Sequence, residues 1–252
     1  PLFGPPGSEA PTGALSEAHA VVIYTACPDE NLVRNARRAC PGPVIEWPVQ
    51  PDGAVHAALH FARAVARAPG MHALPPPALH VPEELQQWAD GWLARHFAAP
   101  ARPVAVHPGS GAERKCWPAQ RFARLIQRLD GPVLLLEGPA DREACRRVEE
   151  LVPPGAPLVY ASGLGVPQVA ALLARCRLYI GNDSGISHLA AALGAPTIAI
   201  FGPTAPAVWA PRGPQVTVAG GDRPGDLWPS AEGVIALLPQ RSIRLRPGRP
   251  EV

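Results

Sequence analysis

The fold is decided by Tyr179-Ile-Gly-Asn-Asp-Ser-Gly-Ile-Ser-His188, which continues as Leu189-Ala-Ala-Ala-Leu-Gly-Ala-Pro196 and Thr197-Ile-Ala-Ile-Phe-Gly-Pro203. The pattern predicts a buried strand, a tight polar turn, a short helix and a second buried strand. The first N–H groups of a helix have no intrahelical partners, and the helix dipole adds partial positive charge there. We therefore expect an anion site, typically for phosphate, where this helix begins.

The composition describes a soluble globular protein. The chain has 252 residues, 47% hydrophobic and 17% charged, which suits one large or two small domains. Its formal charge of +2 is small, and no run of basic residues interleaves with aromatics, so nucleic-acid binding is not indicated. Lysine occurs once, at Lys115, and the arginine-rich residues 241–252 are interpreted as a solvated tail.

Cysteine usage and hydropathy predict a cytoplasmic location. The five cysteines are scattered and show no CxxC spacing, which argues against a disulfide framework or a zinc site. No apolar run approaches the roughly 18 residues that span a bilayer, and nothing resembles a secretory signal. The chain opens on Pro1 and its only methionine is Met71, so we expect a trimmed or processed piece.

The first hundred residues predict a small α/β region. Residues 1–19 are rich in proline and glycine and are expected to form a loop. Strands are expected at 20–25 and 44–47, and helices at 28–39, 55–68 and 83–97, with a proline break at 75–77 and a hinge at 100–103. His56 and His60 have the i, i+4 spacing of metal ligands, but an amphipathic helix face is favoured because no third ligand is evident.

From residue 104 strands and helices alternate regularly, which predicts parallel βαβ units and a doubly wound sheet. Strands are expected at 104–107, 133–137, 158–160, 178–180, 197–201 and, at an edge, 216–218. Helices are expected at 118–129, 141–151, 166–175, after Asp183, and at 231–238. Ligands of such sheets bind beyond the carboxyl ends of the strands. His107, Gly138, Asn182 and Gly202 all lie at such ends, so four loops should converge on one edge.

Two segments after the first of these strands suit a phosphate. His107-Pro-Gly-Ser-Gly111 supplies two glycines and Ser110 where the backbone could approach a ligand closely. Lys115 follows in the same loop, and its ammonium could reach a diphosphate. The alternatives are an ordinary glycine-proline loop and a solvated surface lysine.

The loop after the second strand offers two acids, Asp141 and Glu143. Either could simply enrich the first turn of a helix. A carboxylate at this edge could instead accept ribose hydroxyls, as in other doubly wound nucleotide sites, and Glu143 is preferred for that role.

The turn before the helix that is expected after Asp183 carries the strongest group. Ser184 and Gly185 are expected to offer N–H groups to phosphate, while Asp183 holds the loop or meets the sugar. His188 lies one turn further and could donate to the diphosphate. The alternative is that Asp183 or Ser184 is an N-cap and His188 packs in the helix. Adjacent Asp183 and Ser184 point apart, so these residues do not form a hydrolase triad, and no G-x-S-x-G elbow is present.

These motifs resemble the C-terminal half of glycosyltransferase family 9, which includes the ADP-heptose:lipopolysaccharide heptosyltransferases. The resemblance covers about residues 100–240, and it rests on four motifs in order: His107-Pro-Gly-Ser-Gly, Lys115-Cys-Trp-Pro, the 181–197 segment and Phe201-Gly-Pro-Thr. The family implies a GT-B fold, in which two Rossmann-like domains face a cleft. The expected division is 1–100 as a partial acceptor-side domain, 101–240 as the nucleotide-sugar domain, and 241–252 as a tail.

The resemblance also implies roles for individual residues. Ser110 and Lys115 would bind the diphosphate, Glu143 would lie near the ribose and Leu164 against the adenine. The phosphates and sugar would be surrounded by Asp183, Ser184, Gly185 and His188. Family members open with a strand and a glycine-rich loop whose Asp acts as general base. No such segment precedes residue 100, so the N-terminal domain is expected to be incomplete and the base to be absent from this chain.

The function implied is transfer of a heptose-like sugar, with inversion, from a nucleotide diphosphate donor to a glycan or lipopolysaccharide acceptor. The donor is expected to be ADP-linked, with no cofactor and no metal. Peripheral association with a membrane is left open. One alternative is a non-catalytic nucleotide-binding protein, for which binding without turnover would be the sign. Another is an epimerase-like GT-B enzyme, which would bind UDP rather than ADP.

Overall fold

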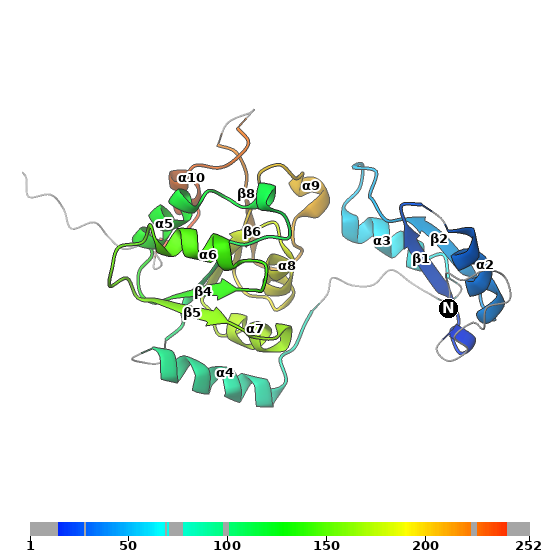
Figure 1. The fold of residues 1–252 in the computed structure, drawn as a ribbon, viewed down its shortest axis with the longest axis horizontal. Coiled ribbons are helices and arrows are strands. Elements are labelled where there is room, and N and C mark those ends of the chain that lie inside the picture. Colours follow the sequence, from blue (N-terminus) through cyan, green and yellow to red (C-terminus); the bar gives the residue numbers. More distant parts are fainter. Residues whose placement is uncertain are drawn as a thin grey trace, which may run out of the picture. The chain divides into compact units, whose positions relative to one another are not determined.

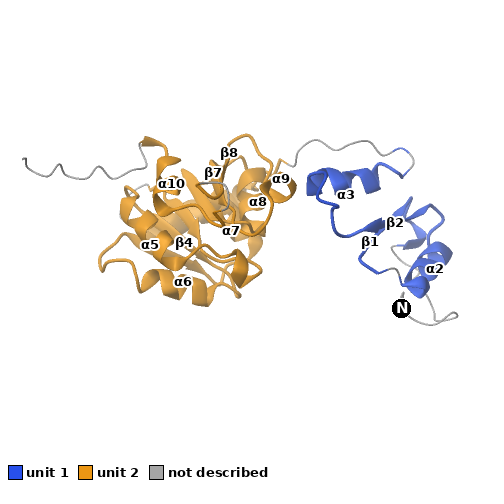
Figure 2. Cartoon of the chain, turned by 90° about the horizontal axis from the view of Figure 1, so that it is seen from above, with its two compact units in different colours: residues 1–75 blue, residues 76–252 orange. Residues whose placement is uncertain are grey.

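The computed structural model describes residues 15–27, 29–68, 70, 78–97, 101–222 and 226–240. Residues 1–14 of the loop predicted at 1–19, the predicted break at 75–77 and the predicted tail at 241–252 lie outside this part of the chain. The chain divides into two compact units, Pro1–Pro75 and Pro76–Val252, which Figure 2 colours separately. Each unit is described by itself.

The first unit contains a two-stranded parallel sheet with helices after each strand. Its elements are β1 (Val21–Thr25), α2 (Glu30–Ala39), β2 (Val44–Pro48) and α3 (Ala57–Val65). Asp29 caps α2 by accepting hydrogen bonds from the N–H groups of Asn31 and Leu32. The four predicted elements are therefore present, with ends that differ by a few residues.

His60 within α3 serves packing, and His56 at its N-cap position serves capping. His60 is buried and contacts the Pro48 carbonyl at 2.7 Å through Nε2, while its ring lies 5.7 Å from that of Trp47. His56 precedes the helix, and its Nδ1 accepts a hydrogen bond from the Ala58 N–H. The amphipathic reading of this helix is confirmed.

The second unit is a doubly wound α/β domain built on a six-stranded parallel sheet (Figure 1). The strands lie in the order β5-β4-β3-β6-β7-β8. They are β3 (Val104–His107), β4 (Val133–Glu137), β5 (Leu158–Ser162), β6 (Leu178–Asn182), β7 (Thr197–Ile200) and β8 (Val216–Ala219). All pairings are parallel, so every strand ends at the same edge. The predicted sheet, including its edge strand, is confirmed.

Helices cover both faces of this sheet. Its helical elements are α4 (Glu83–His96), the 3₁₀ turn η1 (Glu113–Lys115), α5 (Ala119–Arg128), α6 (Arg142–Glu149), α7 (Val166–Leu173), α8 (Gly185–Ala192), α9 (Pro206–Trp209) and α10 (Ala231–Ala236). Successive strand residues point to opposite faces. Val104 and Val106 accordingly pack with α5, α6 and α10, whereas Ala105 packs with α4, α7 and α8. Two hydrophobic cores thus sandwich the sheet.

Helix α4 belongs to the second unit, so the boundary between the units lies at Pro75–Pro76 and not near residue 100. Trp92 and Leu93 of its predicted apolar stripe are buried in the same core as Leu172 of α7. Arg175, just past α7, donates two hydrogen bonds to the Asp90 carboxylate, at 2.6 and 2.9 Å. The sequence shows the stripe but not the helix against which it packs, because that helix lies some 80 residues further along the chain.

Candidate functional site

The loops that follow β3 and β6 meet where the strand order reverses. These strands are neighbours in the centre of the sheet, with His107 opposite Gly181. The chain leaves β3 towards β4 on one side and reaches β6 on the other side only after β5. The order is that of the Rossmann-type doubly wound sheet, in which ligands bind at this switch point.

Asp183 joins three segments at the switch point. Its main-chain carbonyl accepts a hydrogen bond from Ser110 Oγ at 2.8 Å. Lys115 Nζ donates to the same carbonyl at 3.1 Å and to the carboxylate at 3.2 Å. Thr204 Oγ1, from the loop after β7, donates to that carboxylate at 2.8 Å. Three residues predicted from sequence, Ser110, Lys115 and Asp183, are therefore in direct contact.

The Lys115–Asp183 ion pair is partly buried. The side chains are 22% and 10% exposed, so solvent screens the pair only in part. An ammonium has three N–H donors, and Asp183 takes two of them. Within the described residues the third has no partner, so Lys115 can hold the carboxylate and a bound anion at once.

Asn182, the last residue of β6, binds the loop that follows β3. It is fully buried, and its side-chain oxygen accepts a hydrogen bond from the Trp117 N–H at 2.9 Å. Its amide nitrogen donates to the carbonyls of Pro108 and Gly109 at 2.8 and 3.2 Å. Buried amides need such partners, and these fix the loop that carries Ser110 and Lys115 against β6.

His107 links the ends of β3, β4 and β6. It is buried, and Nε2 donates a hydrogen bond to the Asp141 carboxylate at 3.0 Å. The Gly138 N–H donates to the same carboxylate oxygen at 3.0 Å. The hydrogen bond from His107 is the main cause that lowers the pKa of Asp141. Gly109 has no room for a side chain because a Cβ there would lie 1.8 Å from the Asp141 carboxylate.

Helix α8 begins at Gly185, two residues after Asp183. Ser184 is its N-cap residue and is 8% exposed, whereas Gly185 and His188 are exposed. The Ser187 N–H donates to the Ser184 carbonyl at 3.1 Å. Within the described part of the chain the N–H groups of Gly185 and Ile186 have no partner, as expected for a first helical turn.

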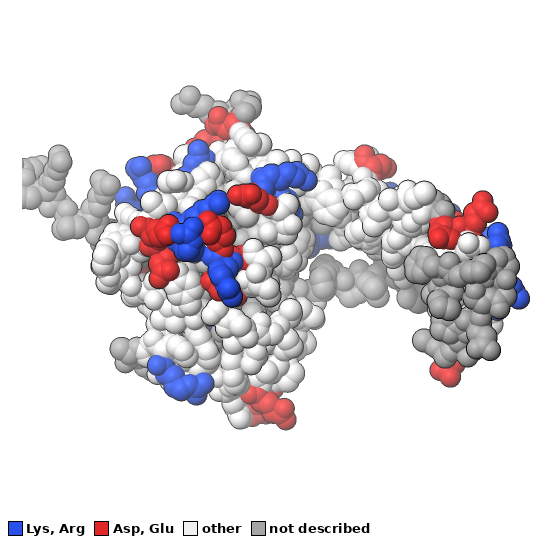
Figure 3. All heavy atoms as spheres, in the orientation of Figure 1, with Lys and Arg blue, Asp and Glu red and all other residues white. Residues whose placement is uncertain are grey.

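Within the described residues, the neighbours of Glu143 and Leu164 are other than Ser110, Lys115 and Asp183. The Glu143 carboxylate accepts hydrogen bonds from Arg146 and Arg147, and mainly the first of these lowers its pKa to about 2. Figure 3 shows the mixed patch of acidic and basic side chains over α6. Leu164 follows β5, half-buried against the α7 core. The geometry thus tests neither predicted nucleotide contact, and both stay predictions.

Three residues of the site have no role predicted from the sequence: His107, Asn182 and Thr204. The pattern marks the first two only as strand ends and Thr204 only as part of a motif. Of the two acids after β4 the sequence favours Glu143, whereas the structure brings Asp141 to His107. The signal in the sequence is that loops follow buried strands at four separate places. This predicts a binding edge of the sheet, but it does not predict which side chains of different loops contact one another.

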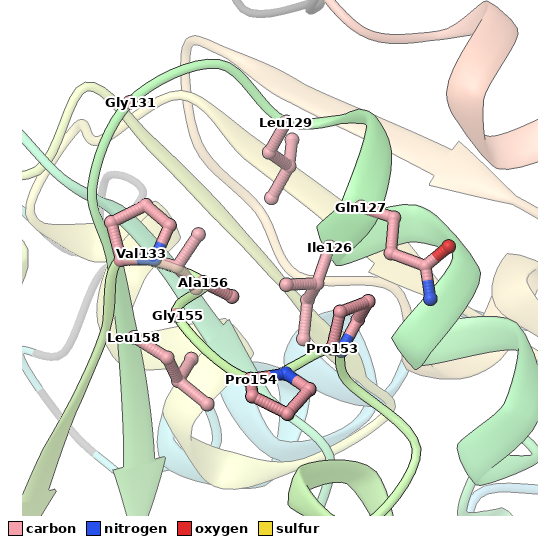
Figure 4. Close-up of a pocket in the computed structure, with 11 residues that line it drawn as sticks. Ile126, Gln127, Leu129, Gly131, Val133, Pro153, Pro154, Gly155, Ala156 and Leu158 are labelled. Atoms are coloured by element: carbon pink, nitrogen blue, oxygen red, sulfur yellow. The ribbon is translucent and has the colours of Figure 1, made fainter.

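Other features of the described chain lie away from this edge. A hollow of about 390 Å³ opens between Leu129, Val133, Pro153 and Leu158 (Figure 4). Val133 and Leu158 begin β4 and β5, so this hollow lies at the opposite end of the strands. Among the described residues no three His, Cys, Asp or Glu side chains are grouped to hold a metal ion. No described helix is both long and apolar enough to cross a membrane.

The motifs and the switch-point geometry agree with a sequence comparison. The profile of the family described as glycosyltransferase family 9 (heptosyltransferase) matches residues 61–226, well over half of the chain. The chain belongs to glycosyltransferase family 9. This confirms the resemblance expected from the four motifs.

Two curated relatives within the family illustrate the similarity. Lipopolysaccharide heptosyltransferase 2 of Salmonella typhimurium is 28% identical over 169 residues, which cover 64% of this chain and 47% of the relative. Lipopolysaccharide heptosyltransferase 3 of Escherichia coli is 33% identical over 116 residues, covering 43% of this chain and 33% of the relative. The chain thus matches between a third and a half of the length of these relatives.

Solved structures from the family share the fold. The family 9 glycosyl transferase of Veillonella parvula aligns with a TM-score of 0.65 at 22% identity, covering 80% of this chain and 63% of the other. The E. coli heptosyltransferase WaaC with ADP aligns with a TM-score of 0.59 at 20% identity, covering 86% and 70%. These likenesses confirm the α/β fold of GT-B type.

Proposed function

We propose that this chain binds the diphosphate of a nucleotide sugar at the start of α8 and serves transfer of that sugar to an acceptor. The observation that carries the proposal is the convergence of Ser110, Lys115 and Thr204 on Asp183 at the sheet's switch point. This arrangement places a lysine ammonium beside the open N–H groups of a helix terminus. Both favour a diphosphate.

The donor is an ADP-linked, heptose-like sugar. Support comes from the relatives: two are lipopolysaccharide heptosyltransferases, and the E. coli structure was solved with ADP. The acceptor is then a sugar hydroxyl of a glycan or lipopolysaccharide. Ser110, Gly185 and His188 complete the diphosphate site, while Glu143 at the ribose and Leu164 at the adenine follow from the family resemblance.

Chemically, these residues stabilise the leaving group. When an acceptor hydroxyl displaces the nucleoside diphosphate from the anomeric carbon with inversion, negative charge grows on the diphosphate. Lys115, His188 and the start of α8 would neutralise that charge without a metal ion. Preorganised donors are effective because they need little rearrangement as the charge develops. Transfer also requires a general base that takes the proton of the acceptor hydroxyl. None of the residues assigned above to the diphosphate site serves as that base.

Replacement of the single lysine tests the proposal. Lys115→Ala should weaken ADP binding more than tenfold, because it removes the only ammonium at the site and leaves Asp183 as an uncompensated carboxylate. Isothermal calorimetry with ADP and with UDP measures the effect. Arg114→Ala is the matched control, since it removes an exposed cation from the adjacent position of the same turn. Equal ADP affinity in the Lys115→Ala variant and the wild type would sink the assignment.

A transfer assay with the same protein addresses catalysis. Sugar transfer together with ADP binding supports the full proposal. ADP binding without turnover would instead indicate the non-catalytic alternative, and tighter binding of UDP than of ADP would point to an epimerase-like enzyme.

A further inference from the structure

Helices α6 and α8 begin in an unusual way. Each has a good capping residue at its N-cap position, Asp141 for α6 and Ser184 for α8. In such positions the side-chain oxygen normally accepts a hydrogen bond from an N–H group in the first turn. Neither side chain does so here. Both are buried and contact the same residue, His107.

The hydrogen positions around His107 follow from its partners. An ionised carboxylate only accepts hydrogen bonds, so His107 Nε2 carries the hydrogen that it shares with Asp141. In the tautomer with its hydrogen on Nε2, Nδ1 carries a lone pair and is an acceptor. The Ser184 hydroxyl lies 3.4 Å from Nδ1 and can donate its hydrogen there. The contact is long, but it gives the hydroxyl a partner on the ring, and the hydroxyl makes no capping hydrogen bond to the first turn of α8.

A second serine closes this buried network. Ser187 donates to the Asn182 carbonyl at 2.5 Å, so its oxygen is left to accept from the Tyr179 hydroxyl, 3.0 Å away. Ser187 Oγ also lies 3.5 Å from Ser184 Oγ. Gly181 makes room for the phenol, since a Cβ there would lie 2.2 Å from the Tyr179 oxygen. Ser184 is therefore held within a buried polar network.

We propose that His107 is a positioning residue that draws the Ser184 hydroxyl away from α8 and so keeps the N–H groups of Gly185 and Ile186 open for a diphosphate. The inference rests on the proposed function for the identity of the anion. A serine that capped α8 would accept from Ile186 N–H and compete with that ligand. His107 removes this competition, while Asp141 sets which ring nitrogen carries the hydrogen.

An Asp-His-Ser chain also invites comparison with a hydrolase triad. Here Nε2 faces the acid and Nδ1 faces the serine, the reverse of the arrangement in which Nε2 takes the serine proton. Ser184 is only 8% exposed, in extended backbone with a φ of −154°. The geometry suits a structural hydrogen bond to a buried hydroxyl and not an exposed nucleophile.

Two conservative variants separate the two ring nitrogens. His107→Gln keeps a donor near Nε2 for Asp141 but removes the acceptor for Ser184. His107→Asn keeps an acceptor near Nδ1 for Ser184 but removes the donor for Asp141. We expect H107Q to weaken ADP binding by about fivefold, the typical worth of a serine cap. H107N should bind ADP nearly as well as the wild type while melting at a lower temperature.

Removing the competing hydroxyl should rescue the defect. Ser184→Ala alone should lose less ADP affinity than H107Q loses, and the double variant H107Q/S184A should bind ADP as the Ser184→Ala variant does. A merely structural role for His107 predicts no such rescue. If H107Q does not fold, Ser184→Asn provides the same competition, because asparagine is a comparable cap, and it leaves His107 in place.

Amide hydrogen exchange gives a readout that needs no nucleotide. The Ile186 N–H should exchange more slowly in H107Q than in the wild type, and the wild-type rate should return in H107Q/S184A. If the wild type binds no ADP, the proposed function fails, yet these exchange rates still decide the role of His107. Unchanged Ile186 exchange in H107Q would overturn the inference. Equal losses of ADP affinity in H107Q and H107N would overturn it, and so would a larger loss in S184A than in H107Q. Covalent labelling of Ser184 by a fluorophosphonate would overturn it as well.

Discussion

Helices α8 and α10 both begin with a serine, but the two serines have different tasks. Ser230 caps α10, since its hydroxyl accepts a hydrogen bond from the Gly233 N–H at 2.9 Å. Its own N–H donates to the Asp222 carboxylate. Ser184 makes no such cap and turns towards His107. A terminus is closed where a side chain caps the first N–H groups of the helix, and open where none does. The residue type therefore does not decide between the two states. The neighbour that competes for the serine hydroxyl decides.

The difference in capping agrees with the surroundings of the two helix N-termini. The start of α8 lies at the switch point beside Lys115, where an anion is expected. Helix α10 packs its buried residues, including Val234, into the core shared with α5. A closed terminus stabilises the helix by satisfying its own donors. An open terminus forgoes that stabilisation until a ligand supplies the missing acceptor.

The largest expected effect comes from placing a carboxylate at each serine. Ser184→Asp should weaken ADP binding by about a hundredfold or more, because a fixed negative charge would occupy the start of α8 and repel the diphosphate. Ser230→Asp should leave ADP affinity unchanged, since aspartate caps about as well as serine and α10 is not part of the site. Calorimetry on both variants compares them directly. Equal losses would show that the two termini do not differ in function.

A smaller effect concerns the acid that orients His107. At neutral pH, Asp141→Asn should lower the free energy of unfolding by about 2 kcal/mol, because it weakens a buried, charge-assisted hydrogen bond. The folded-state pKa of Asp141 is lowered from 3.8, so its stabilisation is complete above 3.8 and is lost as the pH falls through the folded-state pKa.

Denaturant unfolding of wild type and Asp141→Asn at several pH values measures this linkage. The gap in stability between the two proteins should stay constant above about pH 5 and narrow below pH 3.8. The neighbouring Cys116, Cys145 and Tyr179 stay neutral throughout, because their pKa values are raised, chiefly by burial. A gap that widens on acidification would contradict the assignment of a lowered pKa.

The smallest effect separates a capping serine from one that does not cap. Ser230→Ala should lower the free energy of unfolding by about 1 kcal/mol, the usual cost of losing a serine cap. Ser184→Ala removes no cap and should cost less. Thermal and denaturant unfolding of the two alanine variants provides the comparison. A larger loss for Ser184→Ala would mean that its contacts with His107 and Ser187 stabilise the fold more than a helix cap does.

Much of the fold could be predicted from local patterns. The alternation of apolar β-branched runs with amphipathic stretches gave every strand of the six-stranded sheet, because burial on both faces requires continuous apolar strands. The short elements η1 and α9 were not predicted, since three or four residues show no period. Helix α4 was predicted correctly but assigned to the wrong side of the domain boundary, because its stripe does not reveal its partner.

The sequence by itself determined where an anion could bind: a glycine-containing turn after a buried strand, at the start of a helix, with Lys115 in another loop at a strand end. These are properties of short segments and need no knowledge of strand order. Only the tertiary structure decided which side chains meet. His107 finds Asp141 34 positions away and Ser184 77 positions away. That meeting depends on β3 lying between β4 and β6, and it is this packing that turns a capping serine away from its own helix.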